Sequence, residues 1–148
     1  MTVMEQVKRV CFGLNIESRE GLHRSVMNEL KELFIKGGYI VYPEYPIRFD
    51  SKAGKKGERI SRNGYIDLMA VKNGRRIAIE FDNGVNLKFK SVEKLFQIDA
   101  DLRIGIVRGK SETIDFGIDR IRKLLRKFDF PSKSLRVISL TEKKICSL

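Results

Sequence analysis

The sequence is poor in the residues that build disulfide frameworks and zinc sites. Its 148 residues include two cysteines, Cys11 and Cys146, which lie near opposite ends of the chain, and a single histidine, His23. No CxxC spacing occurs, so a reduced protein of the cytoplasm is expected. Long hydrophobic runs are also absent, because no apolar stretch approaches the roughly 20 residues of a membrane span. The first residues lack the pattern of a signal peptide.

Nucleotide-binding loops are missing as well. Residues 53–57 read Ala-Gly-Lys-Lys-Gly, which lacks the GxxxxGK[ST] spacing of a P-loop, and no GxGxxG follows a strand. A nucleotide-binding α/β domain is therefore disfavoured.

Positive charge dominates the chain. Thirty Lys and Arg residues stand against nineteen Asp and Glu, giving a net charge of +11. This balance favours a polyanionic partner, with nucleic acid preferred to a membrane surface. The length predicts one domain over residues 1–148, in which residues 1–19 form an N-terminal extension, read as either a short helix or an extra strand. A homodimer stays an open alternative.

Hydrophobic periodicity predicts an α/β fold. A helix is expected from Ser18, as N-cap, to Lys36, followed by a strand to Phe49 whose far half Pro43 and Pro46 assign to a sheet edge or a bent segment. After a hairpin over residues 65–82, the pattern predicts a helix starting near Ser91. A strand, a helix and a last strand then follow, over residues 102–107, 112–127 and 135–140. The strands on either side of the helix near Ser91 are both strongly apolar, which predicts a parallel crossover.

A flexible basic loop is expected over residues 51–64, which contain a single acid. Its positive side chains are the first candidates for contacts to a DNA backbone: Lys52, Lys55, Lys56, Arg59 and Arg62. The helix around Arg120–Lys127 is the second candidate.

Three acids are the most informative feature. Asn73-Gly74 between two β-prone runs predicts a two-residue type I′ turn, so Asp67 should lie opposite Glu80, with Asp82 on the same face. Like charges placed this closely destabilise a sheet, and a divalent cation, Mg²⁺ or Mn²⁺, would relieve the repulsion. The alternative is an exposed hairpin whose acids are solvated or paired with lysines and arginines. Apolar neighbours on both faces favour a buried sheet, with Ile66, Leu68 and Ala70 expected on one face.

With these acids and this element order, residues 20–109 resemble the PD-(D/E)xK nuclease superfamily, which includes restriction enzymes, archaeal Holliday junction resolvases and repair nucleases. The resemblance implies a restriction endonuclease-like core: a central mixed β-sheet flanked by helices, in the order αβββαβ and then αβ. It also implies that Asp67 and Glu80 bind Mg²⁺. The lysine that normally assists the attacking water is replaced by Asp82, which could instead be a metal ligand or general base.

A displaced lysine is expected on the helix after the hairpin. Lys90, Lys94 and Gln97 form one polar stripe, which is either a solvated face or a source of the missing cation. Because related nucleases place functional residues on this helix, Lys90 or Lys94 is preferred, and Lys88 is a third option.

The first helix supplies a further candidate. The family often adds an acid from this helix, and Glu29, at the edge of the apolar face, is preferred, with a plain surface acid as the alternative. His23 falls near the middle of the apolar face, where a satisfied core histidine is expected.

These observations favour a metal-dependent DNA endonuclease that hydrolyses phosphodiester bonds. The alternative is a catalytically inactive nucleic-acid-binding module on the same fold, whose catalysis was lost when the lysine became Asp82.

Overall fold

The computed structural model describes residues 1–18, 20–51, 60–109, 114–129 and 133–148. A six-stranded mixed sheet lies at the centre, with its strands in the order β1-β2-β3-β4-β5-β6. Its strands are β1 (Ile40–Ser51), β2 (Ile60–Lys72), β3 (Arg75–Asp82), β4 (Leu102–Val107), β5 (Arg136–Ser139) and β6 (Lys144–Ser147). The helices of the described part are α1 (Val3–Phe12), α2 (Leu22–Lys36), α3 (Phe89–Gln97) and α4 (Ile114–Lys127). The expected α/β class, with a mixed sheet flanked by helices, is confirmed.

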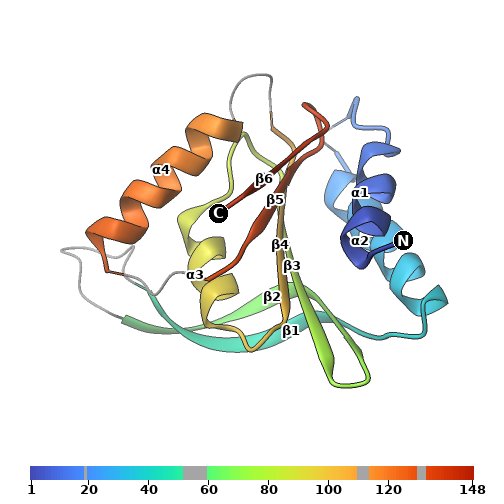
Figure 1. The fold of residues 1–148 in the computed structure, drawn as a ribbon, viewed down its shortest axis with the longest axis horizontal. Helices are drawn as coiled ribbons and strands as arrows, with labels where there is room; N and C mark the ends of the chain where they lie inside the picture. The colour runs from blue at the N-terminus through green and yellow to red at the C-terminus, as the bar shows by residue number, and fades with distance from the viewer. Residues whose placement is uncertain (19, 52–59, 110–113, 130–132) are drawn as a thin grey trace.

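The helices cover the two faces of the sheet in pairs. Helices α1 and α2 lie on one side of the central strands, and α3 and α4 lie on the other (Figure 1). Each side has its own apolar core: Leu30 and Phe34 of α2 pack with Ile79 and Ile106, and Leu95 of α3 packs with Met69, Ala78 and Val107. Strand β3 is buried along most of its length because both of its faces are covered.

The β2–β3 hairpin has the geometry expected from Asn73-Gly74. Both residues have positive φ, 50° and 79°, and Lys72 pairs with Arg75. The next connection, from β3 through α3 to β4, joins two parallel strands, as the apolar pattern predicts.

Strands β1 and β2 extend well beyond the rest of the sheet. Their antiparallel pairing runs from Ile40 with Val71 to Ser51 with Ile60. The extended part of β1 and β2 lies at the bottom of the molecule and passes beneath α3 (Figure 1). We call residues 45–51 of β1 and 60–66 of β2 the arm. Strand β1 is an edge strand and continues through both prolines, so of the two alternatives for its far half, an edge or a bent segment, the edge is found.

Several expected boundaries are wrong. Residues 60–64 belong to β2 and not to a loop, because they pair with β1, whereas residues 52–59 lie outside the described part of the chain. Helix α2 begins after Gly21, which has a φ of 72° and offers no side-chain cap, so Ser18 is not the N-cap. Strand β6 was not expected at all. The N-terminal extension contains helix α1, whose Thr2 and Glu5 form a capping box.

No helix in the described ranges is long and apolar enough to cross a membrane.

Candidate active site

Asp67 lies where strands β2 and β3 separate. The paired residues of the two strands end at Leu68 with Ile79. One step further, Oδ2 of Asp67 accepts a hydrogen bond of 2.8 Å from the backbone N–H of Phe81. The Asp67 side chain therefore accepts the hydrogen bond that a backbone carbonyl of β2 would otherwise accept from Phe81. This bond holds the Asp67 carboxylate beside β3, at the point where β2 leaves β3 to form the arm.

Strand β2 also changes the side on which its residues are buried at this point. Leu68 and Ala70 pack with α2, whereas Ile66 packs with α3. The expectation that these three residues share one face is wrong, because the alternation is broken around Asp67, where β2 turns into the arm. The turn places Asp67 between the two layers, with 22% of its side chain exposed.

Glu80 points toward α3 from the middle of the sheet, and only 4% of its side chain is exposed. Burial raises the pKa of Glu80 to about 8, and the negative charge of Asp67 acts in the same direction. The neighbouring ammonium of Lys94 lowers this pKa, and Asp82 raises it by a smaller amount. A carboxyl group with this pKa gains or loses its proton at a pH near 8, and a bound cation can take the place of the proton.

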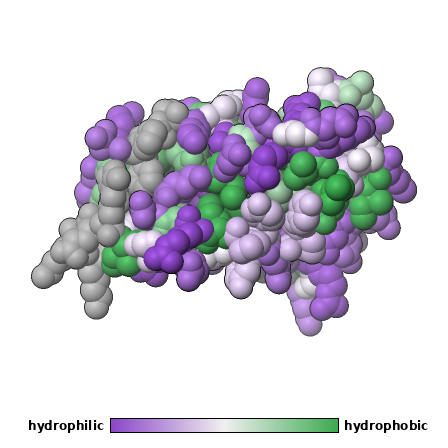
Figure 2. Space-filling model, turned by 90° about the horizontal axis from the view of Figure 1, so that it is seen from below, coloured by the Kyte–Doolittle hydropathy of each residue, from purple (hydrophilic) through white to green (hydrophobic). Residues whose placement is uncertain are grey.

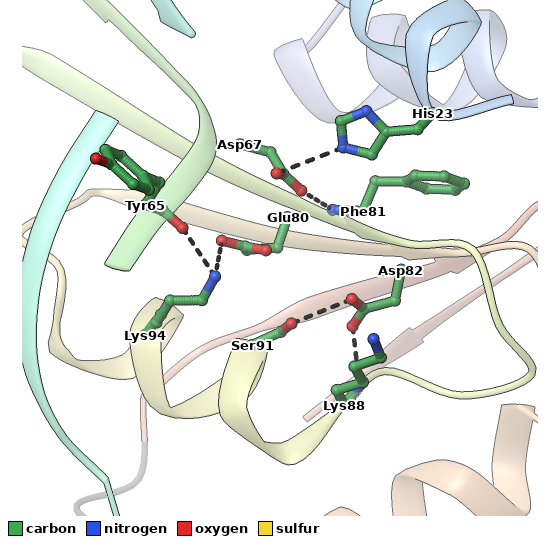
Figure 3. A network of polar contacts seen from close by, with 9 residues as sticks. All are labelled: His23, Tyr65, Asp67, Glu80, Phe81, Asp82, Lys88, Ser91 and Lys94. Atoms are coloured by element: carbon green, nitrogen blue, oxygen red, sulfur yellow. Dashed lines mark hydrogen bonds and ion pairs between the residues drawn. The ribbon is translucent and has the colours of Figure 1, made fainter. Parts of the chain in front are cut away.

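Lys94 brings a positive charge to this carboxylate. Its ammonium lies 2.8 Å from Oε1 of Glu80 and donates a hydrogen bond of 2.8 Å to the backbone carbonyl of Tyr65 (Figure 3). The contact with Glu80 is an ion pair by distance but not a well-formed hydrogen bond, so Oε1 has no hydrogen-bond partner among the described residues. Of the three lysines considered from the sequence, Lys94 is the one whose ammonium the structure brings to the acids.

Hydrogen bonds between the arm and α3 fix the position of the helix that carries Lys94. The side-chain amide of Gln97 bonds both the N–H and the carbonyl of Asp50, at 2.7 and 2.8 Å. One turn earlier, Glu93 is fully buried and accepts a 2.9 Å hydrogen bond from Ser51. Gly64 leaves room for the Phe49 ring, since a Cβ at residue 64 would lie 3.0 Å from Cε1 of Phe49, whereas its 3.5 Å distance to Cδ of Lys94 would be an ordinary contact.

Asp82 accepts hydrogen bonds from two residues at the start of helix α3. Its Oδ2 accepts a hydrogen bond from the backbone N–H of Lys88, the N-cap residue, at 2.9 Å, and its Oδ1 accepts one from the Ser91 hydroxyl at 3.3 Å. Both carboxylate oxygens thus have donors on the helix, and Figure 3 shows them directed toward Lys88 and Ser91. The structure gives Asp82 an anchoring role that its sequence position did not suggest.

Two other candidates remain apart from the acids. Lys90 and Glu29 are both exposed. No hydrogen bond or ion pair among the described residues joins either side chain to Asp67 or Glu80. The structure therefore does not assemble these two residues with the site.

His23 is the α2 residue that does reach the site, and its expected burial in the core is wrong. Its side chain is 54% exposed, with Nε2 lying 3.4 Å from Oδ1 of Asp67 and the ring centroid lying 5.6 Å from that of Phe81. The late start of α2 explains the error, because His23 lies in the first turn beside the end of the hairpin.

Of the proposed DNA-binding residues, the structure describes Arg62, which is exposed on β2 opposite Phe49. The other four, Lys52, Lys55, Lys56 and Arg59, lie outside the described residues.

The metal-binding capacity of the site rests on two carboxylates. In the ranges that the structure describes, no group of three or more His, Cys, Asp and Glu side chains is placed to hold a metal ion. Asp67 and Glu80 still fit Mg²⁺, which is often bound through one or two carboxylates together with water and substrate phosphates. Oε1 of Glu80 lies 2.8 Å from the Lys94 ammonium, so the second oxygen of this carboxylate is the one left for such a cation.

No protein-family model and no curated protein matches the chain.

Proposed function

We propose that the protein is a metal-dependent DNA endonuclease that hydrolyses phosphodiester bonds. The observation that carries this proposal is the placement of the Lys94 ammonium 2.8 Å from the buried carboxylate of Glu80, with Asp67 close enough to raise the pKa of that carboxyl. A pair of acids beside one fixed lysine is the set of groups that the PD-(D/E)xK resemblance requires, with the lysine supplied by α3.

Each residue has a separate role in this proposal. Asp67 and Glu80 would hold Mg²⁺ or Mn²⁺, which supplies an activated water and neutralises the charge on the phosphate. Lys94 would stabilise the negative charge that develops on the attacked phosphate, since a positioned cation acts strongly in a site shielded from water. The bond from Lys94 to the Tyr65 carbonyl holds the ammonium in place before substrate arrives.

The net charge of +11 supports DNA as the partner, because cationic side chains bind the phosphate backbone without regard to sequence. The two cysteines are free thiols, with Cys11 buried, which supports the reduced cytoplasm as the compartment.

A catalytically inactive DNA-binding module is the second candidate. It is favoured by Asp82, whose carboxylate caps α3 instead of joining the other two acids. In this case the Lys94 ammonium would be the permanent partner of Glu80, with no metal required.

Cleavage of plasmid and branched DNA, with Mn²⁺ and with EDTA, separates the two candidates. The endonuclease cuts only with metal, and its Asp67→Asn and Glu80→Gln variants lose cleavage while keeping their fold. Metal-independent binding without any cleavage by the unmodified protein would support the binding module. Glu29→Gln is the matched control, because it removes an exposed carboxylate outside the site.

A further inference from the structure

The arm carries an open groove. It is lined by Pro46, Ile47, Arg48, Asn63, Gly64 and Tyr65. Two direct cross-strand pairs, Pro46 with Tyr65 and Arg48 with Asn63, form its floor. Directly paired residues on neighbouring strands project from the same face of a sheet, so these four side chains share one surface.

Helix α3 covers the other face of the arm and leaves this one open. Ile47 and Ile66 pack into the α3 core, and each is adjacent in sequence to a residue of the groove floor. Tyr65, by contrast, is 59% exposed. Figure 2 views the molecule from below, where hydrophobic and intermediate residues lie between strongly hydrophilic ones.

Tyr65 connects this groove to the proposed active site. Its backbone carbonyl accepts the hydrogen bond from Lys94, while its ring points away from the carboxylates (Figure 3). Asp67 follows two residues later on the same strand, about 7 Å further along. A base on the Tyr65 ring would thus lie against the same strand as Asp67, on the face of the arm turned away from Glu80.

We propose that the groove binds an unpaired nucleobase of single-stranded DNA, stacked on the Tyr65 ring. An exposed tyrosine offers a flat surface that every base can cover, and such stacking does not depend on sequence. Within a continuous duplex both faces of a base are already stacked, so the ring selects unpaired or displaced nucleotides. Arg48 lines the same groove, where its Nε donates to Ser61 at 2.9 Å, and it supplies a positive charge for the accompanying phosphate.

This inference deepens the proposed function, because it names DNA with an unpaired nucleotide next to the reacting phosphate as the substrate class. The assignment of a substrate class rests on the proposed nuclease function. The binding itself needs no metal and can be tested without cleavage.

The test compares the binding of short oligothymidylate, of the same oligomer with abasic residues, and of a continuous duplex, all in EDTA. The unmodified protein should prefer oligothymidylate to the abasic oligomer, although both carry the same phosphates. Tyr65→Ala should weaken oligothymidylate binding by about 5- to 140-fold, which is the effect of losing one base stacked on an aromatic side chain. It should leave the binding of the abasic oligomer unchanged. Tyr65→Phe should bind nearly as the unmodified protein does.

Phe116→Ala is the control, since Phe116 is a 70% exposed aromatic residue on α4. Thermal unfolding of each variant verifies that the fold is kept. Equal binding of both oligomers by the unmodified protein would overturn the inference, as would an equal loss for both in Tyr65→Ala. If the stacking result holds but the protein cuts no DNA with Mn²⁺, the inference stands and the proposed nuclease function fails.

Discussion

The ammonium of Lys94 lies 2.8 Å from the buried carboxylate of Glu80, although the two residues belong to different elements, α3 and β3. Under the proposed function, this pair supplies the cation that the superfamily motif would provide with a lysine at the position of Asp82. Both side chains are largely shielded from water. The charge of Glu80 should therefore depend strongly on pH and on whether a metal ion is bound.

The stability of the protein should fall as the pH rises through the range in which Glu80 ionises. Its pKa is raised from 4.5 to about 8 in the folded protein, so between these values the folded state holds a proton that the unfolded state has lost. This contribution is complete below pH 4.5 and is lost by about pH 8. Glu80→Gln cannot ionise, and we expect it to be more stable than the unmodified protein above pH 8, by on the order of a few kcal/mol.

Urea unfolding at several pH values measures this difference, with Glu29→Gln as the control. Parallel pH profiles for Glu80→Gln and the unmodified protein would show that Glu80 is ionised throughout.

Metal binding should strengthen with pH over the same interval. A carboxyl group must lose its proton before it ligates a cation, so Mn²⁺ competes with the proton on Glu80 below about pH 8. Calorimetric titration with Mn²⁺ at pH 6 and at pH 8 should show the tighter binding at pH 8, together with proton release at pH 6. Glu80→Gln and Asp67→Asn should each lose most of the affinity. Affinity that is independent of pH in the unmodified protein would place the metal elsewhere.

Asp82→Ala should weaken the fold more than the metal site. The change removes the acceptor of the Lys88 N–H and of the Ser91 hydroxyl at the start of α3. A buried donor without a partner costs about 1–3 kcal/mol, so the unfolding midpoint should drop accordingly. Mn²⁺ titration of the folded variant should give an affinity close to that of the unmodified protein. A complete loss of Mn²⁺ binding at unchanged stability would make Asp82 a metal ligand instead.

Neutralising the basic residues of the segment 52–62 should reduce the salt dependence of DNA binding. The variant replaces Lys52, Lys55, Lys56, Arg59 and Arg62 by glutamine. For each DNA phosphate that the variant no longer neutralises, the slope of log Kobs against log[salt] should flatten by about 0.9 on duplex DNA. A second variant with the same reduction of charge changes α4 at Arg120, Arg122, Lys123, Arg126 and Lys127 to glutamine. A larger flattening in this second variant would place the DNA on α4.

Much of the fold was predictable because local rules determined it. Asn73-Gly74 fixed the hairpin and its register, since both residues adopt the positive φ of a type I′ turn. The apolar runs of β3 and β4 identified the central parallel strands. The helical stripe that contains Lys94 was recognisable from its spacing alone, but the choice between Lys90 and Lys94 required the position of the arm.

The features that sequence reasoning missed depend on contacts between distant segments. Residues 61–64 carry no apolar side chain, so the segment 60–64 reads as a loop, but pairing with β1 makes it a strand. Asp82 caps a helix that starts several residues later, which no charge pattern reveals. His23 faces Asp67 because α2 begins at Leu22, and a left-handed Gly21 is a weak signal for a helix start.

Single-turnover cleavage by Lys94→Ala and by Lys90→Ala is the decisive measurement of whether Lys94 supplies the missing cation. Both variants remove one lysine from the same helix, but only Lys94 contacts Glu80. With saturating protein and Mn²⁺, we expect Lys94→Ala to slow cleavage by about two orders of magnitude or more, with DNA binding nearly kept, and Lys90→Ala to cleave at almost the unmodified rate. Equal rates in the two variants would show that the cation beside Glu80 takes no part in cleavage.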